Sequence, residues 1–165
     1  MQRLILMRHG ESERPAPGLE DFDRGLIAEG REESRRLGRA LAKAGLLPDL
    51  ALVSSARRTL ETWQAVAETL PAPVETEAER RLYAASASQI AQVVAEAGPR
   101  GEVIMVVGHN PGIHQYAIHL ARQAEVRHTA LYDKFATGSA AVFELDQAGR
   151  PDLERVLEAR ELRGG

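Results

Sequence analysis

Two short apolar runs, each followed by a histidine next to glycine, constrain this chain more than any other feature. Residues 4–7 lead into residues 8–10 (Arg-His-Gly), and residues 103–107 lead into residues 108–110 (Gly-His-Asn). An uninterrupted apolar run of this length predicts a buried strand, and parallel strands present their functional side chains at their carboxyl ends. The two histidines are therefore expected at the same edge of one sheet.

Strand and helix patterns alternate along the rest of the chain. Strands are predicted at residues 3–7, 50–53, 103–107 and 140–145, with a short strand around Val74 and a final edge strand at 152–160 whose pattern also allows a helix. Helices are predicted at residues 28–45 and 56–70, from Ser86 or Ser88 to Ala97, and after His109 with Pro111 near the first turn. This alternation predicts an α/β fold, a three-layer α/β/α sandwich with a mostly parallel central sheet, in a single domain of residues 1–165.

Finer expectations concern the segments near the strand ends. Residues 11–26 form a long polar loop beside the first histidine, and loops of this length are more often functional or mobile than decorative. Residues 77–85 are expected to be irregular. Ser54 and Ser55 are expected to cap the helix at 56–70. Leu60 is expected on the buried stripe of that helix.

Composition excludes several classes of function. The formal charge of −3 provides no basic surface for a nucleic-acid backbone. The chain has no cysteine, which excludes a disulfide scaffold, a zinc–cysteine site and a cysteine nucleophile. No run approaches the roughly 18 apolar residues of a membrane span, and the N-terminal apolar run is too short for a signal peptide. We therefore expect a cytoplasmic protein with no membrane and no nucleic-acid partner.

The first histidine and its neighbour suggest phosphate chemistry. A histidine that directly follows a buried strand and precedes a glycine is held firmly, with room for a ligand close to the backbone. His9 can then act as a nucleophile, while the planar guanidinium of Arg8 can hold phosphate oxygens. The alternative is a partly buried His9 that only satisfies a backbone carbonyl. The second histidine unit favours the functional interpretation.

Several segments, in order along almost the whole chain, resemble the histidine phosphatase (phosphoglycerate-mutase-like) superfamily. They are residues 6–11 (Leu-Met-Arg-His-Gly-Glu), 53–62 (Val-Ser-Ser-Ala-Arg-Arg-Thr-Leu-Glu-Thr) and 108–112 (Gly-His-Asn-Pro-Gly). Residues 23–30, 82–83 and 137–141 are similar to the SixA-like branch of that superfamily. The chain departs from the branch at Gly25, Ile27 and Thr59, where proline, threonine and alanine are usual, and none of these changes removes a charged group.

This resemblance implies a mechanism and a set of site residues. His9 attacks phosphorus and becomes a phosphohistidine, which water then hydrolyses. The residues implied to bind the phosphate oxygens are Arg8, Arg58, His109 and Asn110. The arginines and a protonated histidine supply the positive charge, so that no metal ion or other cofactor is expected.

Two assignments within this set have competitors. Arg57 competes with Arg58 for the arginine of the motif, and the spacing to Thr62 favours Arg58. Leaving groups usually need an acid, and Glu79 is the candidate by position, although it could equally be a solvated loop glutamate. The resemblance to the SixA-like branch implies that a dedicated acid is dispensable, because the P–N bond of a phosphohistidine breaks readily once its nitrogen is protonated from solvent.

Chain length bears on the substrate. Only 25 residues separate Tyr83 from His109, which leaves no room for the insertions that enclose substrates in mutases and small-molecule members of the superfamily. An open pocket suits a phosphorylated side chain on another protein, for which a histidine-phosphorylated phosphorelay protein is the expected partner. The alternatives are a phosphatase for sugar or nucleotide phosphates and a phosphoprotein-binding module that has lost catalysis. The sequence predicts no oligomeric state.

Overall fold

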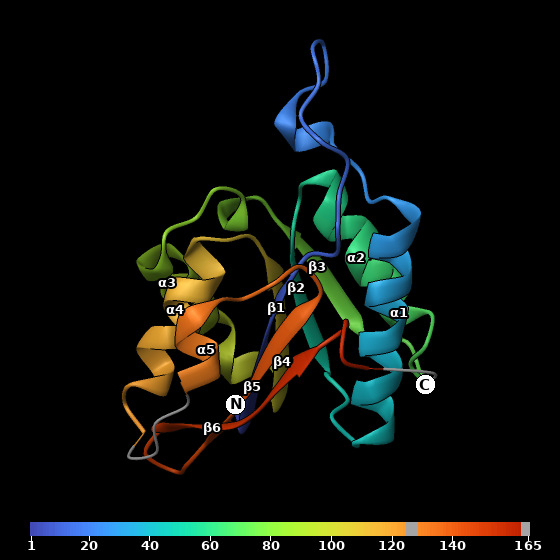
Figure 1. Ribbon diagram of the computed structural model, residues 1–165. Coiled ribbons are helices and arrows are strands. Elements are labelled where there is room, and N and C mark those ends of the chain that lie inside the picture. Colours follow the sequence, from blue (N-terminus) through green and yellow to red (C-terminus); the bar gives the residue numbers. More distant parts are fainter. Residues whose placement is uncertain (125–128, 163–165) are drawn as a thin grey trace.

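The computed structural model describes residues 1–124 and 129–162, and one six-stranded sheet lies at its centre (Figure 1). The strands lie in the order β3–β2–β4–β1–β5–β6. Their bounds are β1 Arg3–Arg8, β2 Leu50–Ser54, β3 Glu75–Glu79, β4 Val103–Gly108, β5 Ser139–Leu145 and β6 Pro151–Glu158. The first four strands in this order are parallel, whereas β5 and β6 are antiparallel to their neighbours. The prediction of a mostly parallel sheet is confirmed.

Helices cover both faces of the sheet, which confirms the three-layer sandwich. One face carries α1 (Ala28–Lys43) and α2 (Arg57–Ala67), and the other carries α3 (Ala87–Ala97), α4 (Gly112–Ala121) and the short α5 (Thr129–Asp133) (Figure 1). The side chains of β1 alternate between these layers: Leu4 and Leu6 join the apolar cluster of α3 and α4, whereas Ile5 and Met7 join that of α1 and α2. Among the described residues, no helix combines the length and apolarity that crossing a membrane requires.

Two local predictions are confirmed by the ends and edges of the elements. The helix predicted from Ser86 or Ser88 begins with Ser86 as its cap, where Ser86 Oγ accepts from the Gln89 N–H and the Gln89 side chain accepts from the Ser86 N–H. Buried and exposed residues alternate at the start of β6, and the segment pairs with β5, so the strand alternative for the tail is correct.

The prediction that residues 77–85 are irregular is wrong in its first part. β3 covers Glu75–Glu79, slightly later in the chain than the strand expected around Val74, and it pairs in parallel with β2. A short 3-10 helix, Arg80–Leu82, follows it. β3 lies at the edge of the sheet and is built largely of glutamate and threonine, so it carries no apolar pattern that would reveal a strand.

Two predictions about α2 are also wrong. Leu60 is 40% exposed, because the buried side of the helix runs through Thr59, Trp63 and Val66 and Leu60 lies off that stripe. The cap residue of α2 is Ala56, which makes no side-chain cap bond. The Ser54 hydroxyl instead contacts the second histidine, as described below.

The loop of residues 11–26 projects beyond the carboxyl edge of the parallel strands (Figure 1). An isolated bridge between Ser12 and Leu26 closes its base, and the Glu13 N–H donates to the Gly25 carbonyl at 2.8 Å. A 3-10 helix, Asp21–Asp23, lies within the loop. The loop is therefore an ordered arm whose second half returns toward the strand ends.

Candidate active site

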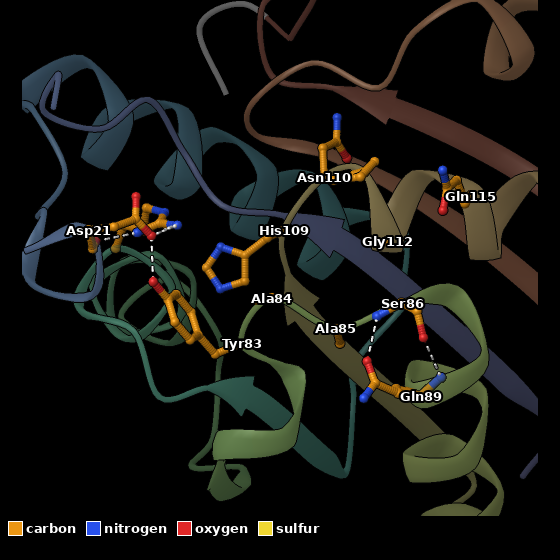
Figure 2. A pocket seen from close by; sticks show the side chains of 12 residues that line it. Asp21, Tyr83, Ala84, Ala85, Ser86, Gln89, His109, Asn110, Gly112 and Gln115 are labelled. Carbon is orange, nitrogen blue, oxygen red and sulfur yellow. Dashed lines mark hydrogen bonds and ion pairs between the residues drawn. The ribbon is translucent and has the colours of Figure 1, made fainter.

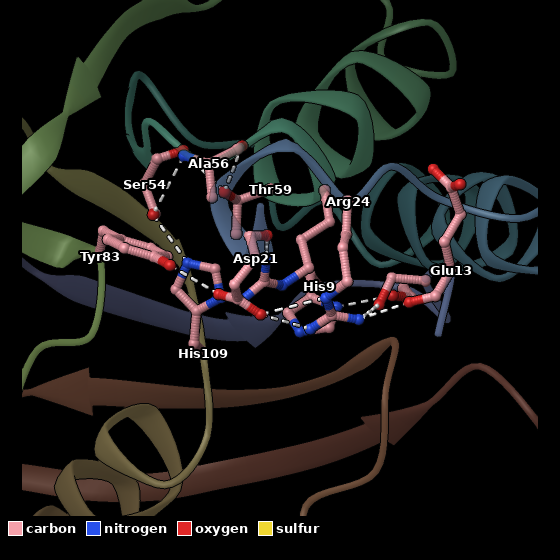
Figure 3. Close-up of polar contacts among 12 residues, drawn as sticks. His9, Glu13, Asp21, Arg24, Ser54, Ala56, Thr59, Tyr83 and His109 are labelled. Carbon is pink, nitrogen blue, oxygen red and sulfur yellow. Dashed lines mark hydrogen bonds and ion pairs between the residues drawn. The ribbon is translucent and has the colours of Figure 1, made fainter. Parts of the chain in front are cut away.

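The histidine that follows β1 is fixed through its backbone. β1 and β4 are parallel neighbours with Arg8 opposite Gly108, so both histidines leave the sheet side by side. The His9 N–H donates to the Gly108 carbonyl at 3.1 Å, and the His9 carbonyl accepts from the Gly138 N–H at 3.0 Å. The ring centroids of His9 and His109 lie 5.4 Å apart (Figure 3). The two apolar runs thus deliver their histidines to one place.

The turn after His9 requires glycine. The Gly10 N–H donates to Thr62 Oγ1 on α2 at 3.0 Å, which draws the turn against that helix. A Cβ atom on Gly10 would stand 2.4 Å from the Gly30 carbonyl oxygen in the first turn of α1. No other residue fits this close approach, which sets the position of the His9 ring relative to both helices.

The buried ring of His9 carries its proton on a defined nitrogen. His9 Nδ1 lies 2.7 Å from the Gly10 carbonyl oxygen, which can only accept, so Nδ1 holds the hydrogen and Nε2 keeps its lone pair. Burial lowers the pKa of His9 to about 4; the bond to Gly10 opposes this shift, and the charges of nearby arginines reinforce it. His9 is therefore neutral at pH 7, with Nε2 available as a nucleophile.

His109 is tied through the opposite nitrogen. Its Nε2 lies 2.7 Å from Ser54 Oγ at the end of β2, while its buried Nδ1 has no hydrogen-bond partner among the described residues. Burial lowers the pKa of His109 to about 3, and His9 and Arg58 act in the same direction. In the free protein, burial and neighbouring groups therefore keep the His109 ring neutral.

Of the two arginines at the start of α2, Arg58 is the one that reaches the site. Its side chain is 7% exposed, whereas that of Arg57 is 55% exposed and pairs with Glu61 at 3.5 Å. Arg58 Nη1 donates to the Asp21 carbonyl at 2.8 Å, and Nη2 donates to the Asp21 carboxylate at 3.2 Å. These bonds fasten the arm of residues 11–26 to α2.

Asp21 joins the arm to the rest of the site (Figures 2 and 3). Besides Arg58, its carboxylate accepts from the Tyr83 hydroxyl at 2.6 Å and from Arg24 Nε and Nη2 at 3.0 and 2.9 Å. These donors, Tyr83 foremost, hold the pKa of Asp21 far below its usual range. The carboxylate is ionised at neutral pH, so in the free protein it has no proton to give to a leaving group.

Arg8 and Asn110 lie on the other side of the histidine pair. Arg8 Nη1 and Asn110 Nδ2 both donate to the Phe135 carbonyl, at 3.3 and 2.8 Å. Burial lowers the pKa of Arg8, which nevertheless stays charged at neutral pH. The shared carbonyl holds both side chains against the segment that follows α5.

Buried polar atoms without partners gather at this site. Within the described residues, five such atoms occur: Arg8 Nε, Arg58 Nε, His109 Nδ1, Asn110 Oδ1 and Ser139 Oγ. Four of them belong to the residues implied to bind phosphate. Because an unpaired buried polar group is costly, such a concentration indicates atoms kept for a ligand. A cleft of about 470 Å³ opens beside them, with Arg58, Tyr83 and His109 in its wall (Figure 2).

Glu79 is not brought into this cluster. It ends the edge strand β3, and its carboxylate accepts from Arg81 Nε and Nη2 at 3.1 and 3.0 Å. These bonds lower the pKa of Glu79, and the residue is absent from the wall of the cleft. The described residues also contain no group of three or more His, Cys, Asp or Glu side chains placed to hold a metal ion.

The structure places four residues at the site for which the sequence predicts no catalytic or binding role: Asp21, Arg24, Ser54 and Tyr83. Arg24 and Tyr83 lie in segments that resemble the SixA-like branch, which was the available signal. Ser54 is predicted as a helix cap. Asp21 follows no strand and lies within an irregular arm, so only the length of that arm pointed to it.

Comparison with known proteins shows which family the chain resembles. The model of the histidine phosphatase superfamily (branch 1) matches residues 4–83. The crystal structure of a SixA-type protein from Agrobacterium tumefaciens, assigned as a phosphohistidine phosphatase, superposes with a TM-score of 0.84 and 29% identity, over 94% of this chain and 97% of that one. An uncharacterised chloroplastic protein of Arabidopsis thaliana is 27% identical over 94% of this chain and 77% of its own length.

Similarity to a mutase is confined to a shorter segment. A 2,3-bisphosphoglycerate-dependent phosphoglycerate mutase of Thermobifida fusca is 45% identical over 64 residues, which are 38% of this chain and 26% of the mutase. The similarity to the SixA-type protein instead spans nearly all of both chains. The matching family model, the fold and the motifs around both histidines agree, and all three are similar to the histidine phosphatase superfamily.

Proposed function

We propose that this protein is a phosphatase that removes the phosphoryl group from phosphohistidine side chains of another protein, by way of a phosphorylated His9. One observation carries the proposal. A neutral His9, with Nδ1 tied to the Gly10 carbonyl and Nε2 free, stands beside buried and unpartnered donor atoms of Arg8, Arg58 and His109. This combination suits a nucleophile together with a receptor for phosphate oxygens.

The reaction takes place in two steps. In the first, the lone pair of His9 Nε2 attacks phosphorus, and a new P–N bond forms as the P–N bond of the substrate breaks. The electron pair stays with the substrate imidazole, which takes up a proton from solvent. In the second, water attacks the phosphorylated His9 and inorganic phosphate leaves, which restores the lone pair of Nε2.

Arg8, Arg58 and His109 donate hydrogen bonds to the phosphate oxygens. Arg8 and Arg58 supply permanent positive charge, so the reaction needs no metal ion. The Ser54 hydroxyl can donate to His109 Nε2, which leaves the proton of the neutral His109 on Nδ1, the nitrogen without a partner. A bound phosphoryl dianion would also raise the pKa of His109, because an opposite charge nearby favours the protonated ring.

The low pKa of the two candidate acids, Asp21 and Glu79, favours a P–N substrate. Asp21 lines the cleft, and Glu79 is the acid that the sequence suggests. Hydrogen bonds lower the pKa of both carboxyl groups. The alkoxide leaving group of a phosphate ester requires a proton from such an acid, whereas the nitrogen of a phosphohistidine can take it from solvent. Glu79 therefore has no part in the proposed mechanism.

The surroundings of the cleft favour a protein substrate. Between Tyr83 and His109 the chain forms only α3, a 3-10 turn at Gly98–Arg100, β4 and short connections, so this stretch supplies no covering domain. A phosphorylated side chain presented by another protein can enter such a cleft. The SixA-type protein of Agrobacterium tumefaciens, which is similar over nearly its whole length, supports the same substrate class, and a phosphorelay protein is the partner we favour.

The test compares substrates under identical conditions with a chelator present. A phosphohistidine-bearing protein, p-nitrophenyl phosphate and a panel of sugar phosphates are hydrolysed by the purified protein, and kcat/KM is measured for each. We expect a kcat/KM for the phosphohistidine substrate about 10²-fold or more above that for any ester, the size of a general-acid contribution. Faster hydrolysis of a sugar or nucleotide phosphate would replace the proposal with a small-molecule phosphatase.

The remaining alternative is a phosphoprotein-binding module that has lost catalysis. The His9→Ala variant distinguishes this alternative from the proposed phosphatase. A module that only binds phosphoproteins would show no turnover, and His9→Ala would leave its affinity for a phosphopeptide unchanged. The proposed enzyme turns over its substrate, and the His9→Ala variant does not.

A further inference from the structure

A second hollow adjoins the phosphate site, next to the cleft that Figure 2 shows. It has a volume of about 420 Å³, and its wall contains Arg8 and Asn110 together with Lys134, Phe135 and Arg160. Asn110 also lines the cleft that contains Arg58 and His109. Arg58 and His109 line the first hollow and Arg8 lines the second, so the candidate phosphate-binding residues are shared between the two hollows.

The two hollows differ in charge. The wall of the second contains three cationic side chains, Arg8, Lys134 and Arg160, against one carboxylate, Asp133. Lys134 and Arg160 are exposed, and neither forms an ion pair within the described part of the chain. Burial lowers the pKa of Arg8, the charge of Glu33 opposes this shift, and the charge of Arg160 reinforces it. The far wall of the first hollow is neutral, with Ser86, Gln89 and Gln115.

The frame of the basic hollow is fixed. Phe135 is buried, its ring stacks on that of His114 at 5.7 Å between centroids, and its carbonyl receives both Arg8 and Asn110. The His114 ring is itself held by the Leu131 carbonyl, 2.6 Å from its Nε2. The exposed cations of Lys134 and Arg160 therefore project from a rigid base that belongs to the phosphate site itself.

We propose that this basic hollow binds an acidic segment of the phosphoprotein, next to the phosphorylated side chain, and that Lys134 and Arg160 determine specificity for it. The inference rests on the proposed function. The sharing of the candidate phosphate-binding residues between two hollows favours a polypeptide, because only a chain that extends on both sides of its phosphorylated residue contacts both. Carboxylates complement the three cations, and in a chain of net charge −3 such a local excess is selective for them.

The test uses two phosphohistidine peptides of equal length, one with glutamate and one with glutamine around the phosphorylated histidine. We expect the wild-type protein to favour the acidic peptide about tenfold in kcat/KM, mainly through KM, because two partly exposed charge pairs together contribute a factor of this size. In Lys134→Ala/Arg160→Ala the ratio falls to about one, and in the wild type it shrinks as salt is added.

The matched control is Arg150→Ala/Arg155→Ala, which removes the same charge from exposed positions at the β5–β6 turn and on β6, and we expect it to keep the preference. Equal kcat/KM for both peptides in the wild type, or an equal loss of preference in the control, would overturn the proposal.

Failure of the proposed function can be told apart from failure of this inference. If neither peptide is hydrolysed but p-nitrophenyl phosphate is, the substrate assignment fails, and the hollow is tested by inhibition of the ester reaction. Inhibition by the unphosphorylated glutamate peptide that is lost in Lys134→Ala/Arg160→Ala supports the acidic-segment site. The absence of inhibition by that peptide, or equal inhibition by the glutamine peptide, rejects it.

Discussion

His9 and His109 occupy equivalent positions at two strand ends, but different ring nitrogens form their hydrogen bonds. Each follows a buried parallel strand, β1 or β4, and each ring is buried and neutral. His9 donates from Nδ1 to the carbonyl of its own neighbour, Gly10, and keeps a free lone pair on Nε2. His109 is held at Nε2 by Ser54, from a different strand, and its Nδ1 has no partner in residues 1–124 and 129–162.

The role that a histidine can take therefore depends on which of its ring nitrogens is already hydrogen-bonded. In the proposed mechanism, the backbone contact at Nδ1 prepares His9 to attack, and the contact of Ser54 with Nε2 leaves the Nδ1–H of His109 to donate to a phosphate oxygen. The two strand ends thus provide a nucleophile and a receptor from the same local design.

The largest expected effect separates the two histidines. We expect His9→Ala to lower kcat/KM by about 10⁴-fold or more, the size seen when a nucleophile is removed. His109→Ala should lower it by about 10²–10³-fold, the cost of one donor to the developing charge, and should still form the phosphoenzyme. Circular dichroism and thermal unfolding serve as controls that both variants fold. Equal losses in the two variants would mean that the histidines do not have distinct roles.

The next effect concerns the arginines of α2. Arg58→Ala removes a buried guanidinium from the site, and we expect kcat/KM to fall by about 10²-fold or more. Arg57→Ala, the matched control, removes an exposed side chain, and kcat/KM should stay within about twofold of the wild type. Steady-state kinetics on a phosphohistidine substrate measures both variants. The reverse order would show that the motif is misaligned by one residue.

A smaller effect is expected where β2 holds His109. Ser54→Ala removes the partner of Nε2, and since one hydrogen bond contributes about 0.5–1.5 kcal/mol, kcat/KM should fall about threefold to tenfold. Ser55→Ala is the adjacent control and should leave kcat/KM unchanged. In the background of His109→Ala, Ser54→Ala should have no further effect on kcat/KM. An undiminished effect in that background would assign Ser54 a role independent of His109.

A separate effect concerns stability and its dependence on pH. The pKa values of His9 and His109, about 4 and about 3 in the folded protein, lie below the usual 6.5. The unfolded chain therefore binds more protons as pH falls below 6.5, and the contribution of both rings to stability is present above 6.5 and lost toward pH 4. Urea unfolding at pH 7 and pH 5 should show a smaller difference in His9→Gln/His109→Gln than in the wild type. His119→Gln, on an exposed histidine of α4, should retain the full difference.

Much of the fold follows from the sequence, and the exceptions have physical causes. The buried strands and their order of alternation with helices are readable because their residues are uniformly apolar, as in β1 and β4. β3 is predicted slightly too early, around Val74, because an edge strand of glutamate and threonine has no apolar pattern to fix its bounds. Leu60 is misplaced because the buried stripe of α2 also contains Thr59, which a search for apolar residues overlooks.

The site is predictable only where its residues are local to the strand ends. His9, His109 and Arg8 follow directly from the two apolar runs, and Arg58 follows from the family resemblance. The bond between Arg58 and Asp21, the contact of Ser54 with His109 and the basic hollow around Lys134 join segments far apart in the chain. Such contacts depend on tertiary packing, and no spacing in the sequence encodes them.

The measurement that tests the account most directly is the location of the phosphoryl group on the enzyme. The protein is mixed with a phosphohistidine substrate and quenched in alkali within milliseconds, a condition under which phosphohistidine survives. Tandem mass spectrometry and phosphorus NMR of the peptides then assign the residue and the nitrogen. The account predicts phosphorylation of His9 on Nε2, with greater accumulation in His109→Ala if hydrolysis is the slowed step. A phosphoryl group on His109, or on Nδ1 of His9, would contradict the division of roles between the two histidines.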